Sequence, residues 1–200
     1  MWGCRAKKVP GTFLRNEDDG AAHSAILSAM TLVKDRLYHT DYYAWTQQQA
    51  AILRRLAASS TPSDLDLENL AEEVADLGKS ERRAVRSQIR RLLEHLLKLE
   101  YGTSPTPRAG WRRTILDARI ELADDLTPTL RRDLEADLQT LYSAARAQAA
   151  EALEAHNDPT AAQSLPTTCP YTLTQLLDRQ WLPVGQRGLE QVLKQPVTEL

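Results

Sequence analysis

Two ionisable side chains near the middle of the sequence, Glu73 and His95, have the chemistry required of an acid–base pair. Each lies between two leucines at three- and four-residue spacing, which places it at the edge of a hydrophobic core if its segment is helical. If the two segments pack as antiparallel helices, the carboxylate can contact the imidazole and raise its pKa. His95 is then a candidate general base or metal ligand. The alternative is a histidine held at the core edge by a hydrogen bond.

Other familiar catalytic and cofactor-binding patterns are missing from the sequence. Glu68 and Glu72 share a helix face, but a carboxylate-bridged metal centre also needs two Glu-x-x-His pairs, and the chain has none. There is no Gly-x-Ser-x-Gly nucleophile motif and no glycine-rich phosphate loop. Cys4 and Cys169 form no C-x-x-C motif, which argues against a zinc ribbon. We therefore predict no metal and no cofactor, and whether the protein is an enzyme stays open.

Charge is segregated between two consecutive segments. Residues 64–76 carry six carboxylates and no Lys or Arg, whereas residues 79–91 carry six basic side chains and one carboxylate. A basic row that can follow a phosphate backbone is formed by Lys79, Arg83, Arg86 and Arg90. The acidic neighbour and the missing helix-turn-helix signature disfavour nucleic acid as a partner. If the two segments are adjacent helices, they form a charged face that suits a protein partner or a second copy of the chain.

Helical periodicity defines the elements that must position these residues. Gly78 stands where a helix C-cap would need positive φ, and Ser80 can cap a new helix after it. Val85, Ile89 and Leu92 begin a row typical of helices in a bundle. The sequence therefore predicts an all-α, mostly antiparallel bundle of about five main helices, over about 41–56, 64–77, 80–99, 110–126 and 128–156.

The composition fits one bundle domain with a tail at each end. The chain has 200 residues, of which 42% are hydrophobic and 26% charged, and its net charge is −2. We assign residues 37–183 to the bundle, including a C-terminal segment that wraps it, and residues 1–36 and 184–200 to loose tails. Met30 is a candidate natural start. No apolar run is long enough to span a membrane, so we expect a cytoplasmic protein without membrane partners.

Several motifs together resemble one family over about Leu37 to Pro183. They are Leu37–Gln49, Leu65–Glu73, Leu77–Arg83, His95-Leu-Leu-Lys98, Trp111–Ile115, Cys169-Pro-Tyr-Thr172 and Leu176-Leu-Asp178. They are similar to the bacterial domain-of-unknown-function 29 family, although Leu99 stands where that family usually has Trp. The resemblance implies a helical bundle without an established activity. It also implies one shared patch formed by Trp45, Asn69, Glu72, Glu73, His95, Lys98 and Trp111.

The sequence thus favours an interaction module that binds a protein partner or itself through the charged face. Two alternatives stay open. One is an enzyme that uses Glu73 and His95 as an acid–base or metal-assisted site, and the other is a nucleic-acid-associated protein that uses the basic row.

Overall fold

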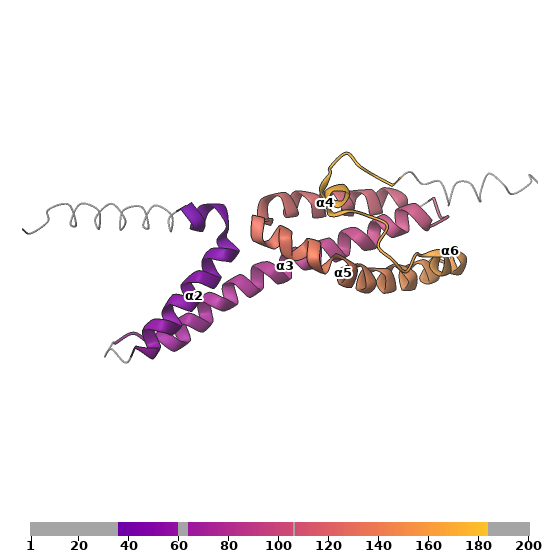
Figure 1. Cartoon of the computed structure of the whole chain (residues 1–200). Helices are drawn as coiled ribbons and strands as arrows, with labels where there is room; N and C mark the ends of the chain where they lie inside the picture. Colours follow the sequence, from indigo (N-terminus) through magenta and orange to yellow (C-terminus); the bar gives the residue numbers. More distant parts are fainter. Residues whose placement is uncertain (1–35, 60–63, 106, 184–200) are drawn as a thin grey trace, which may run out of the picture.

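A computed structural model describes residues 36–59, 64–105 and 107–183. In these ranges the regular structure is entirely α-helical, which confirms the predicted fold class. The predicted tails and the candidate start at Met30 lie outside the described residues, apart from residue 36. The helices are α2 (Tyr42–Ala58), α3 (Leu67–Tyr101), α4 (Arg108–Asp125), α5 (Pro128–Ala155), α6 (Pro159–Ser164) and α7 (Leu173–Leu177) (Figure 1).

Helix α3 is one continuous helix of 35 residues, and the predicted break at Gly78 is wrong. At about 1.5 Å per residue the helix is about 52 Å long. Gly78 is buried inside the helix because α2 crosses it there, and an added Cβ would overlap Thr46 Oγ1 and lie 3.2 Å from Thr46 Cβ. The glycine permits a close approach of two helices and does not end one. The acidic and basic segments therefore follow one another along a single helix and do not face each other.

The body of the bundle consists of the C-terminal half of α3 with α4 and α5, joined by short turns (Figure 1). The predicted row on α3 is its centre, since Val85, Ile89 and Leu92 are at most 1% exposed. Ile115 of α4 and Leu134 of α5 are equally buried. Leucine packing of this kind is the main source of stability in such a body.

The N-terminal half of α3 pairs with α2 to form a two-helix hairpin that extends away from α4 and α5 (Figure 1). Its buried residues are small: Thr46 and Ala50 on α2, and Ala71, Ala75 and Gly78 on α3. The two leucines that flank Glu73, which the sequence predicts in the core, are exposed instead: Leu70 by 41% and Leu77 by 50%. Leu56 of α2 is also 50% exposed.

Asp41 joins this hairpin to the body. Its Oδ1 atom caps α2 by accepting a hydrogen bond from the Ala44 amide at 3.0 Å, and its Oδ2 atom accepts one from the Thr129 amide of α5 at 2.8 Å. Burial raises the pKa of Asp41, but the hydrogen bonds from Ala44, Thr129 and Thr127 outweigh it, so the pKa lies below 3.8. The carboxylate is therefore ionised at neutral pH.

The segment after α6 wraps the body, as predicted. Gln139 of α5 donates a hydrogen bond to the Thr167 carbonyl and accepts one from the Cys169 amide. On the other side of the body, the buried guanidinium of Arg119 on α4 donates to the carbonyls of Leu176 at 2.7 Å and Trp181 at 2.8 Å. The C-terminal segment is thus fixed to both α5 and α4. None of the described helices combines the length and apolar character that a membrane span requires.

Candidate functional site

The structure separates the candidate acid–base pair. Glu73 and His95 are 22 residues apart on the same helix, a separation of about 33 Å along its axis. A proton-transfer pair must be within hydrogen-bonding distance or bridged by one water molecule. The two residues cannot cooperate within one chain, and the prediction is wrong because it depended on a helix end at Gly78. No group of three or more metal-ligating side chains occurs among the residues that the structure describes.

His95 makes local contacts in the body. Its Nδ1 atom lies 3.0 Å from the Arg91 carbonyl oxygen, so the ring nitrogen donates a hydrogen bond one turn back along α3. Burial lowers the pKa of His95, and the positive charge of Lys98 lowers it further, while Glu94 and the hydrogen bond to Arg91 oppose the shift. The imidazole is therefore neutral at neutral pH. This shift is opposite to the one expected from a contact with Glu73.

The predicted shared patch divides into two groups at opposite ends of α3. In the body, the nearly buried Lys98 donates a hydrogen bond to Glu94 at 2.6 Å, and its Nζ atom lies 5.8 Å from the centre of the Trp111 ring. In the hairpin, Asn69 binds the carboxylate of Asp66, the residue that caps α3. Trp45, Glu72 and Glu73 also belong to the hairpin. The residues therefore do not form one patch.

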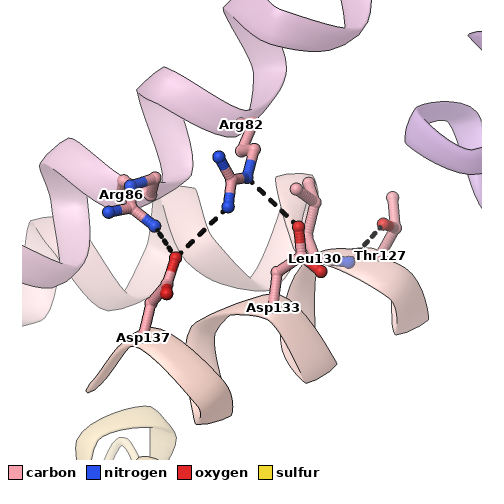
Figure 2. A network of polar contacts seen from close by, with 6 residues as sticks. All are labelled: Arg82, Arg86, Thr127, Leu130, Asp133 and Asp137. Atoms are coloured by element: carbon pink, nitrogen blue, oxygen red, sulfur yellow. Dashed lines mark hydrogen bonds and ion pairs between the residues drawn. The ribbon is translucent and has the colours of Figure 1, made fainter. Parts of the chain in front are cut away.

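Two of the four members of the basic row, Lys79 and Arg86, are engaged by carboxylates. Lys79 pairs with Asp76 at the surface. Arg86 donates to Asp137 of α5, while Arg82 donates to Asp137 at 3.2 Å and to Asp133 at 3.1 Å (Figure 2). The acidic partners of these arginines thus come from α5 and not from residues 64–76. The sequence signal that could have predicted these ion pairs is the matched spacing of their members. Asp133 and Asp137 are four residues apart, and so are Arg82 and Arg86.

Two members of the row, Arg83 and Arg90, line a groove between α3 and α5. Its volume is about 500 Å³. Within the part of the chain that the structure describes, neither guanidinium donates a hydrogen bond or forms an ion pair. The other lining residues are Arg86, Ser87, Thr140, Leu141 and Ala144.

An apolar face covers one side of the hairpin. On α2 and the helical residues 36–40 before it, Tyr38 and Tyr42 pack their rings against Trp45, with centroid distances of 4.8 and 5.6 Å. On α3 the exposed Leu70 and Leu77 lie two turns apart. We define the apolar face as Tyr38, Tyr42, Trp45, Ile52, Leu56, Leu70, Val74 and Leu77.

Helix geometry places both halves of this face on the same side of the hairpin. Trp45 immediately precedes the contact residue Thr46 on α2, and Leu77 immediately precedes the contact residue Gly78 on α3. Successive residues turn by about 100° in the same sense on both helices. The two helices are antiparallel, so a twofold axis perpendicular to the plane that contains both helix axes relates one to the other. This rotation keeps each side of the plane on the same side. Trp45 and Leu77, which each precede a contact residue, therefore lie on the same side of the hairpin.

The described chain is therefore an all-helical protein whose body carries a projecting hairpin with an apolar face. Residues 37–182 match the family described as domain of unknown function DUF29, and the chain belongs to that family. The search of curated proteins found no match. A crystal structure of an alpha-helical protein of unknown function from Rhodospirillum rubrum is similar, with 32% identity and a TM-score of 0.63. The match covers 72% of this chain and 90% of that one.

Proposed function

We propose that the protein is an interaction module that pairs with a second copy of itself through the apolar face of the α2–α3 hairpin. The observation that carries the proposal is the exposure of Leu56, Leu70 and Leu77, each between 41% and 50%. The proposal keeps the interaction function inferred from the sequence and replaces its charged face with an apolar one.

The distribution of exposed apolar side chains supports a docking role for the hairpin. Of the seven exposed large hydrophobic residues in the described ranges, five are located in residues 38–77. The contact between α2 and α3 uses small residues, so pairing these two helices leaves the large side chains in water. An exposed apolar cluster with polar edges is typical of a protein–protein contact. A second hairpin laid on this face completes a four-helix bundle.

Charge at the edges of the apolar face favours a second copy as the occupant. At about 100° per residue from the contact residue Thr46, helix geometry places Arg55 at the outer edge of α2, away from α3. The same geometry, counted from Gly78, places Glu73 of α3 and its N-cap residue Asp66 at the corresponding outer edge, away from α2. A twofold axis parallel to the helices places α2 of one copy over α3 of the other. This arrangement brings Arg55 of each copy beside Glu73 and Asp66 of its partner. Opposite charges flanking an apolar seam select partner and register.

Light scattering coupled to size exclusion tests the pairing. We expect a dimer for the wild-type chain and a monomer for the double variant L70K/L77K, because two buried ammonium groups would oppose apolar burial. The matched control is L116K/I120K on α4, whose side chains are 44% and 43% exposed but lie outside the hairpin. The control must remain dimeric, and circular dichroism must show equal helix content in all three proteins.

Charge reversal tests the arrangement of the two copies. Glu73→Arg should weaken the dimer, and adding Arg55→Glu to the same chain should restore it. A monomeric wild-type chain contradicts self-pairing and assigns the face to a different protein. A dimer that survives L70K/L77K contradicts the assignment of the contact to this face.

A further inference from the structure

We propose that the groove between α3 and α5 is a binding site for a small phosphorylated molecule. The residues that line it from α3 are Arg83, Arg86, Ser87 and Arg90, and those from α5 are Thr140, Leu141 and Ala144. Its volume of about 500 Å³ is within the range of about 300–1,000 Å³ typical of small-molecule sites. This site is independent of the hairpin face.

Two positively charged side chains at the groove, Arg83 and Arg90, are not paired with a carboxylate in the described ranges and can bind an anionic ligand. Asp133 and Asp137, the nearby carboxylates of α5, are engaged by Arg82 and Arg86 (Figure 2). Arg83 acts on the exposed Asp76 only through space, lowering the pKa of that carboxyl together with Lys79. Arg83 and Arg90 therefore supply positive charge that no hydrogen-bonded carboxylate in the described ranges compensates.

The donors in the groove have the chemistry of a phosphate site. Arg83 and Arg90 are two helical turns apart, about 10.5 Å along the axis, and their long side chains can converge over Ser87 between them. The planar guanidinium forms paired hydrogen bonds to phosphate oxygens. The hydroxyls of Ser87 and Thr140 add donors from both walls of the groove, since neither makes a hydrogen bond in the described ranges.

The remaining lining favours an organic phosphate over a nucleic acid. Leu141 and Ala144 provide an apolar wall that an organic group next to the phosphate can contact. A duplex would need a longer basic track, but Lys79 and Arg86 are paired with carboxylates and residues 64–76 repel phosphate. The groove therefore matches a compact ligand that carries a phosphate or diphosphate group.

Isothermal titration calorimetry at low salt tests the site with inorganic pyrophosphate and with ADP as probes. We expect saturable binding of at least one probe, and about tenfold or greater loss of affinity in R83Q/R90Q. The matched control is R54Q/R112Q, which removes the same charge from exposed positions outside the groove. Tighter binding of ADP identifies an organic phosphate as the ligand class, whereas equal affinities identify the inorganic group.

Three results overturn the proposal. They are no binding of either probe, equal loss of affinity in R54Q/R112Q and R83Q/R90Q, and binding of a DNA duplex without binding of either small probe. A monomeric wild-type chain contradicts self-pairing but leaves this site unaffected, so the two proposals fail separately.

Discussion

Replacement of Gly78 by alanine tests the close crossing of α2 and α3, on which the arrangement of the hairpin depends. In an exposed helix interior this change stabilises a protein by about 1 kcal/mol, because glycine loses more backbone freedom on folding. At position 78 the added methyl group would overlap Thr46 Oγ1 and would also lie 2.9 Å from Gln47 Nε2. The steric cost therefore opposes the gain in helix propensity.

The size of the steric cost follows from how firmly Thr46 is held. Its side chain is fully buried, and its hydroxyl donates a 2.7 Å hydrogen bond to the Tyr43 carbonyl. The hydroxyl cannot move without breaking that bond, so the cost should be near the upper end of the range of about 1–3 kcal/mol measured for overpacked cores. After the gain in propensity, we expect Gly78→Ala to lower the free energy of unfolding by about 1–2 kcal/mol.

Urea unfolding followed by circular dichroism, at one fixed protein concentration, measures this change. Gly110→Ala is the matched control, because nothing lies within 4 Å of its added Cβ, and we expect a gain of about 0.5–1 kcal/mol. In a Thr46→Ala background, Gly78→Ala should be less destabilising, with a coupling of about 1 kcal/mol or more. If Gly78→Ala stabilises the chain as Gly110→Ala does, the close crossing is wrong.

Two further predictions concern the body. Arg119→Lys cannot satisfy all the carbonyls that the guanidinium binds, so we expect a loss of about 2–3 kcal/mol and faster amide hydrogen exchange around Leu176. For His95, burial and the charge of Lys98 lower the folded-state pKa below 6.5, so the unfolded chain takes up the proton first as the pH falls. The free energy of unfolding should therefore decrease as the pH falls below 6.5 toward that lower pKa, and thermal melts of His95→Gln should show a smaller decrease.

Local spacing in the sequence accounts for two helix caps and for the central row of the body, although it also suggested false caps at Gly78 and Ser80. Asp41 and Thr127 are caps because their side chains bond to amides three residues ahead, which short-range spacing predicts. The row that begins with Val85 and Ile89 is buried because its three- and four-residue spacing gives a single apolar stripe without a competing row. Neither feature depends on which helices are neighbours.

Gly78 shows why the rest of the arrangement could not be predicted. Glycine can end a helix or can allow a neighbouring helix to approach closely, and the sequence does not distinguish these two roles. At Gly78 only the contact with Thr46 shows that the second role applies. That single choice placed Glu73 and His95 on different helices. It also predicted that the acidic residues 64–76 lie on a helix beside the arginines, whereas the carboxylates that pair with Arg82 and Arg86 are Asp133 and Asp137.

The hairpin contains two competing rows one residue apart on α3. Leu70 and Leu77 belong to a row of large side chains, and Ala71 and Gly78 belong to a row of small ones. Hydrophobicity alone favours the large row as the buried one. The structure buries the small row, because small side chains let two helices approach closely, and the large row remains as the candidate docking surface.

An apolar face is an effective docking surface only if the molecule holds it in place, because freedom lost on association opposes binding. Two connections hold the hairpin: α3 runs without a break from the hairpin into the body, and Asp41 joins the start of α2 to the Thr129 amide of α5. Asp41, whose pKa lies below 3.8, is charged at neutral pH, and hydrogen bonds to a carboxylate are stronger than those between neutral groups. The hairpin is therefore a rigid extension of the bundle, and the proposed pairing requires little ordering of the chain.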